Sequence, residues 1–471
     1  MRNMPVVQAL KNYKEKDMAP FSMPGNKQGR GFSEDLRTLI AFGDITEVDG
    51  MDNLHKPQGV LKRAQELLAS YYGSRKAYFL VNGSTSGNLT MIFSSFKEGD
   101  KILVERSCHK SIFNGIILRK LEPVYIENKF SKEYGLPLGI TLENLKNLLE
   151  AEDNIKGVVL TYPNYYGICS DIKGIIEYLK ERGILSLIDS AHGAHFSATQ
   201  SLPYSAVDLG ADMVVMSAHK THPSLTQGAY LHVNKEELIE ETERYLYMFS
   251  STSPSYPIMA SLDYARAYLQ ERGREDYENL ILRLRNLKER IDATELFTII
   301  DRRNLQSKEE YQEFTIDESR IIIHINHPEG SSSKLSEYLF KRGVQCEMAE
   351  GKNVVLNPGP FNRSEDYERL IVALEACTIH DIKGVEAEPL YHRILKRVYL
   401  PYEALDRKGS YVKISEALGR VCTENIIPYP PGIPLALMGE EIDKAVIDAI
   451  NYYIYNKATI LGIYEDKIKV L

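Results

Sequence analysis

Two short apolar runs in the middle of the chain, each followed by polar residues, restrict the possible folds more than any other feature. The runs Ile184–Ile188 and Met213–Met216 have the length and composition typical of strands buried inside a parallel sheet. Asp189 comes directly after the first run, and Lys220 comes shortly after the second. Because functional groups in open α/β sheets gather beyond the carboxyl ends of the strands, we expect Asp189 and Lys220 to face one crevice.

The wider pattern of the chain predicts more than one domain. Strands and helices alternate from about residue 40 to residue 270, which indicates an α/β domain with a mostly parallel sheet covered on both faces. At 471 residues the chain exceeds what one core usually organises. We therefore divide it into an N-terminal helix and linker (1–40), a large domain (41–275), a small α+β domain (276–380) and a C-terminal domain (381–471).

Composition excludes several classes of protein. The net charge is −8 and no basic patch carries interleaved aromatic residues, which argues against nucleic-acid binding but leaves a small cationic substrate acceptable. The N-terminus lacks the apolar core of a signal peptide, and no apolar run approaches the length of a membrane span. The five cysteines are scattered, so neither a disulfide framework nor a zinc site is indicated. We expect a cytoplasmic protein without a bound metal.

A small, hydroxyl-rich segment, Asn82–Asn88, lies between a predicted strand and a predicted helix. Free backbone N–H groups and the helix dipole favour an anion at such a place, and Ser84, Thr85 and Ser86 add hydroxyl donors. One phosphate group would fit, although the same residues could simply cap the helix. The chain has no GxGxxG or Walker sequence, so readings as a dinucleotide- or ATP-binding protein lose support.

Lys220 and Asp189 together suggest a specific cofactor. A lysine beside histidines at a strand end is a suitable Schiff-base amine, because neighbouring positive charge and burial lower its pKa. A buried carboxylate such as Asp189 could pair with a protonated pyridine nitrogen. With a phosphate site at Ser84 to Ser86, these are the parts that pyridoxal 5′-phosphate (PLP) requires.

Several spaced motifs make the resemblance to a family specific. The segments that carry it are Met51–His55, Asn82–Ser86, Asp189–His192, Ser217–Thr221 and Ile427–Pro434. From about Pro20 to the C-terminus the chain resembles the Orn/Lys/Arg decarboxylases. That resemblance implies a fold-type-I PLP enzyme with an aspartate-aminotransferase-like large domain.

The resemblance also implies roles for individual residues. Lys220 would form the Schiff base, Asp189 would pair with the pyridine nitrogen, and His109 would stack on the ring. A flat imidazole suits stacking, but His109 could instead be a helix-start residue with only a local hydrogen bond. The residues expected to surround the phosphate or the ring edge are Ser84, Thr85, Ser86, His192, Ser217 and His219.

The predicted activity is decarboxylation of lysine, arginine or ornithine to the corresponding amine, a step of polyamine biosynthesis. The leaving carboxylate must align with the π system of the cofactor, and Lys220 or His219 would return the proton to the carbanion. The distal cation of the substrate needs a carboxylate. Glu424 is one candidate, although it could be a solvated helix residue, and Asp49 and Asp52 are alternatives.

Two features depart from the family pattern. The chain starts almost at the linker to the PLP domain, without the N-terminal wing domain of inducible members, so we expect a homodimer with its active site near the subunit interface. Many relatives have Pro-Gly-His-Lys where this chain has Pro24-Gly25-Asn26-Lys27. If that histidine contacts substrate in the relatives, Asn26 affects substrate choice here.

Three other functions are alternatives to decarboxylation: another PLP-dependent reaction, metal-dependent hydrolysis and non-enzymatic regulation. An aminotransferase or a carbon–sulfur or carbon–carbon lyase would use the same fold, and an aminotransferase would need a carboxylate-binding arginine, for which Arg363 is the candidate. A metal hydrolase could use His192 and His195 with Asp189, but their spacing does not match the helical HExxH pattern. A non-enzymatic regulator would have no need for Lys220 together with Asp189.

Overall fold

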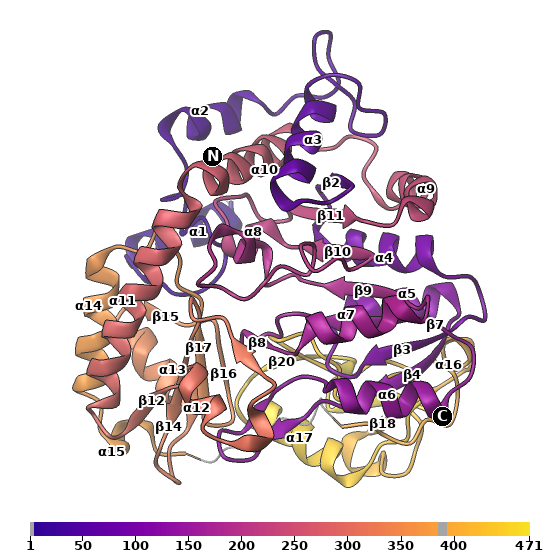
Figure 1. The fold of residues 1–471 in the computed structure, drawn as a ribbon. Coiled ribbons are helices and arrows are strands. Elements are labelled where there is room, and N and C mark those ends of the chain that lie inside the picture. The colour runs from indigo at the N-terminus through magenta and orange to yellow at the C-terminus, as the bar shows by residue number, and fades with distance from the viewer. Residues whose placement is uncertain (1–3, 385–392) are drawn as a thin grey trace.

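A seven-stranded sheet forms the centre of the computed structural model, which describes residues 4–384 and 393–471. Neighbouring strands are parallel except β11, which runs antiparallel to both of its neighbours, so the predicted mostly parallel sheet is confirmed (Figure 1). In spatial order the strands are Lys76–Leu80 (β2), Ala229–Val233 (β11), Met213–Met216 (β10), Leu185–Asp189 (β9), Ile155–Thr161 (β7), Lys101–Glu105 (β3) and Glu122–Ile126 (β4).

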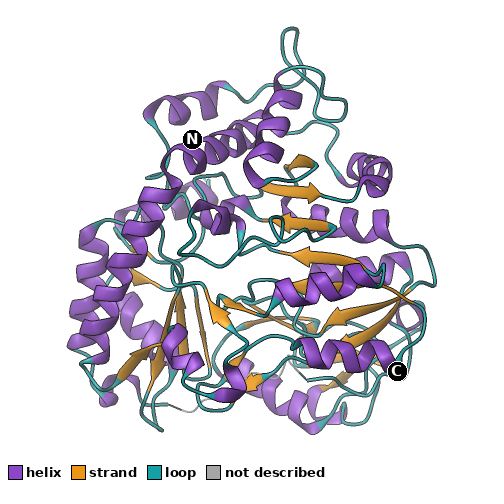
Figure 2. Cartoon of the chain, in the orientation of Figure 1, coloured by secondary structure: helices purple, strands orange, loops and turns teal. Residues whose placement is uncertain are grey.

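Helices cover both faces of this sheet, as Figure 2 shows. Successive strand residues face opposite ways: Leu187 packs into one apolar cluster and Ile188 into the other. The first cluster contains residues of α4 (Gly83–Ser95) and α5 (Lys110–Arg119), with Leu246 of α9 (Ile239–Phe249) packed against it. The second contains residues of α3 (Val60–Tyr72), α6 (Leu142–Ala151), α7 (Ile172–Glu181) and α10 (Tyr256–Tyr268).

Strand register brings the predicted functional residues to one edge. Asp189, the last residue of β9, lies opposite Val215 of β10 and Thr161 of β7. The chain leaves β10 through Ser217 into α8 (Ala218–Thr221), which carries Lys220. The carboxyl ends of β7, β9 and β10 therefore meet at the same edge of the sheet.

The small domain is a second, antiparallel sheet with helices packed on it. Its strands, in spatial order, are Phe297–Ile299 (β12), Ile321–Ile325 (β14), Asn353–Leu356 (β17) and Met348–Glu350 (β16). The helices α13 (Ser332–Lys341) and α14 (Ser364–Glu375) contribute to the same core. This agrees with the predicted α+β character of the region.

One long helical rod joins the two domains. The helix α10 continues through a π-helical turn, Leu269–Gly273, into α11 (Arg274–Asp292). The domain boundary predicted at 275/276 falls inside α11. The apolar side chains of α10 and α11 share a core with both sheets, so the chain does not need a loop between the helices.

The C-terminal region has a core of its own. The helix α17 (Lys444–Tyr455) packs with a three-stranded sheet of β18 (Ser410–Lys413), β22 (Lys467–Val470) and β21 (Ile463–Tyr464). Arg106, fully buried after β3, donates to the carbonyl oxygens of Pro434 (2.8 Å) and Leu435 (3.1 Å) and pairs with buried Glu440. These contacts attach the C-terminal region to the large domain.

The N-terminal segment forms no core of its own and is attached to the small domain. The helix α1 (Pro5–Glu15) has no buried residue, and α2 (Glu34–Phe42) is capped by the Ser33 hydroxyl. Between them β1 (Ala19–Pro20) pairs in parallel with β15 (Val344–Gln345) of the small domain. The remaining short elements are β5 (Phe130–Ser131), β6 (Leu136–Pro137), β8 (Ile168–Cys169), α12 (Arg302–Gln306), β13 (Thr315–Ile316), α15 (Ile379–Ile382), α16 (Pro401–Leu405), β19 (Ile427–Tyr429), β20 (Thr459–Leu461) and the 3₁₀ turns Ala194–Ala198, Glu236–Leu238, Glu309–Tyr311 and Ile414–Glu416. Of the helices that the structure describes, none is long and apolar enough to cross a membrane.

Candidate active site

A cleft of about 400 Å³ lies at the carboxyl edge of the central sheet, where four parts of the chain meet. The volume lies within the usual range of small-molecule sites. The large domain contributes six residues that were predicted for the site: Ser84, His109, Asp189, His192, His219 and Lys220. The N-terminal segment contributes Met23 and Pro24, the small domain Glu347, and the C-terminal region Tyr429, Pro430, Pro431 and Ile433.

Lys220 presents its amine to this cleft. Its Nζ lies 3.0 Å from Nε2 of His192. Burial lowers the pKa of Lys220 to about 8; Arg320 lowers it further, and the carboxylates of Asp189 and Glu347 oppose the change. About a tenth of the amine is therefore uncharged, and nucleophilic, at pH 7, far more than for a lysine with an ordinary pKa.

Asp189 is held at the end of β9 by two hydrogen bonds. Only 2% of the residue is exposed. Its Oδ2 accepts from Nδ2 of Asn88 (2.8 Å), and its Oδ1 accepts from the backbone N–H of Ala191 (3.1 Å). Burial raises the pKa of Asp189, whereas Lys220 and these two donors lower it. The carboxylate is thus placed where a cationic N–H group would satisfy it.

Asn88 also connects Asp189 to His109. Its Nδ2 donates to Oγ of Ser111 (2.9 Å), and Ser111 Oγ lies 2.9 Å from Nδ1 of His109. His109 caps α5 by accepting from the Ser111 N–H, and it also lines the cleft. The capping hydrogen bond therefore does not prevent the ring from facing the cleft. Burial, with Lys220 and Lys110 adding to it, lowers the pKa of His109 to about 3. The ring is therefore uncharged, as a stacking partner for a flat ligand requires. Asn88 and Ser111 were not predicted, although both lie close to predicted motifs.

The hydroxyl-rich segment forms the first turn of α4 rather than a separate turn before it. The helix begins at Gly83, whose φ of +76° suits glycine. Ser217 donates its hydroxyl to Ser84 Oγ (2.8 Å), and Ser84 lines the cleft. Ser86 is buried and donates to the Gly83 carbonyl, while Thr85 is exposed and does not line the cleft. Ser84 is thus the hydroxyl of this cluster that lines the cleft, and the fully buried Ser217 supports it from behind.

His192 and His219 flank Lys220 in different ways. His192 lies between Lys220 and Arg320, and burial, followed by the charges of Lys220 and Arg320, lowers its pKa well below the usual value. Nδ1 of His219 lies 3.0 Å from the Gly228 carbonyl. Burial lowers the pKa of His219 to about 4, and Lys220 adds to this while the Gly228 bond opposes it.

Glu347 is the acidic residue that sequence reasoning missed. It lies between β15 and β16 and lines the cleft. Its Oε1 accepts from the Tyr165 hydroxyl (2.5 Å), and its Oε2 accepts from the Met23 backbone N–H (2.7 Å). No local motif marks Glu347, because its position depends on the placement of the small domain over the large one.

The three acids predicted to bind substrate are not among the described residues that line this cleft. Glu424 lies in the C-terminal region and pairs with Lys469 at 3.5 Å. Asp49 is exposed. Asp52 accepts the backbone N–H groups of Gly59 (2.8 Å) and Leu61 (3.0 Å) at the start of α3. Burial alone would raise the pKa of Asp52, but its backbone donors together lower it. Within one chain, Asp52 therefore stabilises a helix start.

Two further expectations concern residues near the cleft. The side chain of Asn26 donates to the Ser224 carbonyl of the large domain (3.0 Å) and accepts from the nearby Gly29 N–H (2.9 Å), and Asn26 is not among the cleft residues. Arg363, the candidate carboxylate ligand of an aminotransferase, is exposed at the start of α14. Neither position supports the contact with substrate that was considered.

The two histidines of a possible metal site have separate partners. His192 faces Lys220, whereas Nε2 of His195 lies 3.0 Å from both Asp317 and Ser319. Among the residues that the structure describes, no three His, Cys, Asp or Glu side chains are grouped to hold a metal ion.

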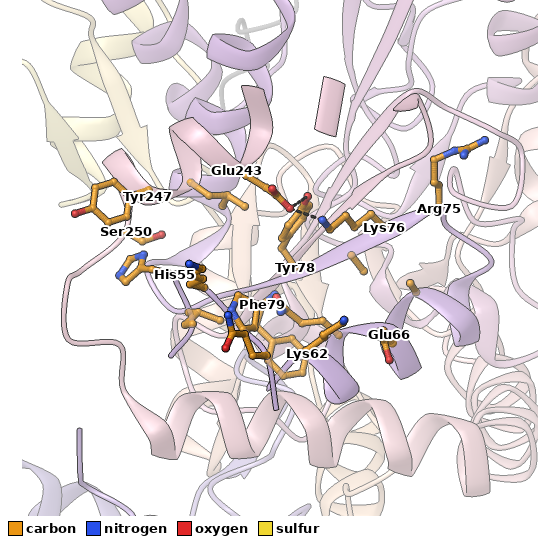
Figure 3. Close-up of a pocket in the computed structure, with 18 residues that line it drawn as sticks. His55, Lys62, Glu66, Arg75, Lys76, Tyr78, Phe79, Glu243, Tyr247 and Ser250 are labelled. Atoms are coloured by element: carbon orange, nitrogen blue, oxygen red, sulfur yellow. Dashed lines mark hydrogen bonds and ion pairs between the residues drawn. The ribbon is translucent and has the colours of Figure 1, made fainter. Parts of the chain in front are cut away.

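Figure 3 shows a second cavity, of about 440 Å³, which is separate from the cleft. It is lined by parts of α3, β2 and α9 and by residues 54–58. Lys76 pairs there with Glu243, which also accepts from the Tyr78 hydroxyl. The residues that line the cleft do not line this cavity, so the predicted chemistry belongs to the cleft alone.

Comparison with protein families decides the family of the chain. A model described as the Orn/Lys/Arg decarboxylase major domain matches residues 4–341, and one described as the C-terminal domain of that family matches residues 380–460. The chain belongs to the Orn/Lys/Arg decarboxylase family. The resemblance inferred from the motifs is therefore confirmed, and the chain is an enzyme of the amino acid decarboxylase class.

Relatives of this decarboxylase support the same assignment. It is 37% identical over 478 residues to the uncharacterized protein YaaO of Bacillus subtilis (strain 168), covering 100% of this chain and 98% of that protein. It is 30% identical over 457 residues to an arginine decarboxylase of the same organism, covering 95% of this chain and 92% of the relative.

Solved structures show the fold. The constitutive lysine decarboxylase of E. coli has a TM-score of 0.76 at 18% identity, covering 100% of this chain and 82% of that one. A serine palmitoyltransferase from S. paucimobilis with bound PLP has a TM-score of 0.56 at 14% identity, covering 76% and 86%. The predicted fold-type-I architecture is confirmed by these likenesses.

Proposed function

We propose that the chain is a PLP-dependent decarboxylase of a basic amino acid: lysine, arginine or ornithine. The observation that carries the proposal is the convergence of Lys220 and Asp189, from separate strand ends, on one cleft with His109. The arginine and lysine decarboxylases among the relatives support this substrate class.

The cleft fits PLP in three respects. Asp189 is a buried carboxylate stabilised from behind by Asn88, so a ring N–H could bind on its free side. The N-terminus of the thirteen-residue helix α4, with Ser84, offers N–H and hydroxyl donors to a phosphate, and Ser217 donates to Ser84 from behind. Lys220 supplies the amine. When bound, PLP would supply an electron sink for the electron pair that carbon dioxide leaves behind.

The remaining chemistry falls to side chains of the protein. His109 would hold a flat ligand by stacking, and Asp189 would keep a ring nitrogen protonated. Lys220, whose pKa is about 8, is better suited than His219, whose pKa is about 4, to return a proton to the substrate carbon near neutral pH. This favours Lys220 over His219 for that step.

Glu347 is our candidate for binding the distal cation of the substrate. Its carboxylate already accepts two hydrogen bonds, from Tyr165 and Met23, which fix its orientation. Two oxygen atoms offer further acceptor capacity to an ammonium or a guanidinium. In a homodimer, Asp49 or Asp52 of the partner subunit could also contribute a carboxylate to substrate binding. The physiological role that we propose is polyamine formation.

The test is turnover of each basic amino acid by the PLP-loaded protein, with amine product and carbon dioxide measured together. We expect amine and carbon dioxide in equal amounts from one of the three substrates. The Lys220→Ala variant should lose turnover, and it should also lose the visible absorption band of PLP joined to Lys220. Formation of a keto acid without carbon dioxide would instead establish an aminotransferase, and an active Lys220→Ala variant would contradict the proposal.

A further inference from the structure

A buried arginine stands behind His192, on the side away from Lys220. Arg320 precedes β14 in the small domain and is 3% exposed. Its Nη1 donates to the Tyr165 carbonyl (3.1 Å), and its Nη2 lies 3.5 Å from Nδ1 of His192. The charge of Arg320 acts on the buried carboxylate of Asp317, but within residues 4–384 and 393–471 no carboxylate forms a direct ion pair with the guanidinium, and Asp317 itself pairs with His195. A guanidinium buried without such a partner is costly, which points to a role at the neighbouring ring.

The donor capacities of the three side chains fix the hydrogen-bond directions. A guanidinium only donates, so Nδ1 of His192 must accept from it and the single proton of the neutral ring lies on Nε2. Nε2 lies 3.0 Å from Nζ of Lys220 and therefore donates toward it. An ammonium has no lone pair to accept that bond, whereas a neutral amine has one.

We infer that Arg320 is a positioning residue which, by fixing the Nε2–H tautomer of His192, favours the neutral form of Lys220 over the charged form. The uncharged amine is the form that attacks an aldehyde. This inference rests on the proposed function, because it assigns Arg320 to the preparation of Lys220 for cofactor binding.

The surrounding charges agree with these directions. Burial, followed by Lys220 and Arg320, lowers the pKa of His192, so the ring is uncharged. The pKa of Lys220 is lowered first by burial and also by Arg320, against Asp189 and Glu347. The titratable and charged groups around Lys220 are Asp189 at the end of β9, His192 after it, His109 at the start of α5, His219 on α8, Arg320 before β14 and Glu347 between β15 and β16.

The experiment measures the Lys220 amine directly, in cofactor-free protein. Brief treatment with acetic anhydride across pH 6 to 10, followed by peptide mass mapping, gives the fraction of neutral amine, with exposed lysines of the same digest as internal reference. In Arg320→Gln we expect the midpoint for Lys220 to move up by about one pH unit, so that labelling below pH 8 is roughly tenfold slower. Arg320→Lys, which keeps a cationic donor, should recover part of the difference.

Matched variants separate positioning from simple structural damage. Arg363→Gln removes an exposed arginine of the same domain and should leave the Lys220 midpoint unchanged. In a His192→Phe background, which itself should raise the midpoint, Arg320→Gln should have little further effect, because the ring that transmits it is gone. If Arg320→Gln does not fold, the Lys220 labelling midpoints of Arg320→Lys and His192→Phe still test the inference.

An unchanged midpoint in folded Arg320→Gln or in His192→Phe would overturn the inference, as would an equal shift from Arg320→Gln with and without His192. The labelling needs neither cofactor nor turnover. It can therefore fail while decarboxylation is intact, and it can succeed while the proposed function fails.

Discussion

Glu347 differs from the other acids near the cleft because its two hydrogen bonds come from different parts of the chain. Tyr165 belongs to the large domain, and Met23 belongs to the N-terminal segment. A carboxylate fixed in this way loses little conformational freedom when a cation binds. We therefore place the specificity for basic substrates at this residue.

The first prediction concerns Glu347→Gln. The amide keeps the size of the side chain but removes its charge, and a hydrogen bond to a charged group is worth about 1.5–3 kcal/mol. We expect KM for the basic substrate to rise roughly ten- to a hundredfold, with a smaller change in kcat. Steady-state kinetics of amine release measure this. Glu424→Gln is the matched control, and a larger effect there would transfer substrate binding to Glu424 of either subunit.

The second prediction uses Lys27, whose amine donates to the carbonyls of Ser22 and Asn357. Burial lowers its pKa to about 7. The unfolded chain keeps that proton up to about pH 10.5, so unfolding takes up a proton between these values and the free energy of unfolding rises with pH in that window. Between pH 7 and 9, the free energy of unfolding of Lys27→Met should therefore rise by roughly 2–3 kcal/mol less than that of the wild type.

Urea unfolding at pH 7 and pH 9 measures the effect of Lys27→Met. The exposed Lys173→Met serves as control and should keep the rise seen in the wild type. A rise that is equal in the wild type and Lys27→Met would show that Lys27 keeps an ordinary pKa in the folded protein.

At the scale of elements, a loop of the C-terminal region forms part of the cleft wall because Arg106 holds it. Tyr429, Pro430, Pro431 and Ile433 line the cleft, and Arg106 binds the carbonyls of Pro434 and Leu435 directly after them. The carboxylate of its partner Glu440 accepts the Leu437 N–H (2.7 Å) in addition to the guanidinium. The ion pair therefore fixes the segment that directly follows the cleft-lining residues.

The third prediction is that Arg106→Met destabilises the protein by about 3–5 kcal/mol, because it leaves Glu440 buried without a cation. Chemical unfolding measures the change. The double variant Arg106→Met with Glu440→Leu should recover part of the loss, and Arg75→Met, which breaks an exposed ion pair with Glu236, should cost at most about 1 kcal/mol. A cost for Arg106→Met as small as that of Arg75→Met would contradict the role given to the pair.

The sequence predicted some of the elements that form the cleft correctly and others incorrectly or not at all. Strand ends after Ile188 and Met216 were predictable because polar residues follow apolar runs directly, and this alone located Asp189 and Lys220. The start of α4 was misplaced, because Gly83 at positive φ lets the helix begin earlier than the hydroxyl cluster suggests. Glu347 could not be predicted: the parallel pairing of Ala19 with Val344, distant in sequence, brings it to Met23.

At the scale of the whole molecule, the N-terminal helix has an exposed apolar side. Val6 is 71% exposed and Leu10 is 65% exposed, and their spacing places them on one side of α1. An isolated helix of eleven residues is marginal in water unless its apolar side is covered. This supports the expected homodimer.

The fourth prediction follows from that apolar side. We expect sedimentation equilibrium to give the mass of two chains for the wild type and a weaker association for Leu10→Glu, which would bury a charge in the interface. Lys11→Glu changes a neighbouring polar position and serves as control. A wild type that sediments as one chain at micromolar concentration would leave the dimer without support.

The rod made of α10, the π-helical turn and α11 has a consequence for anyone who wishes to divide this enzyme. Residues 256–292 offer no cut point, because an expression fragment ending near residue 275 would stop inside a helix and lose the side chains of Tyr277, Leu280 and Ile281, which belong to the shared apolar core. Large-domain fragments should therefore keep the whole rod, and insertions or split-protein junctions belong elsewhere on the surface.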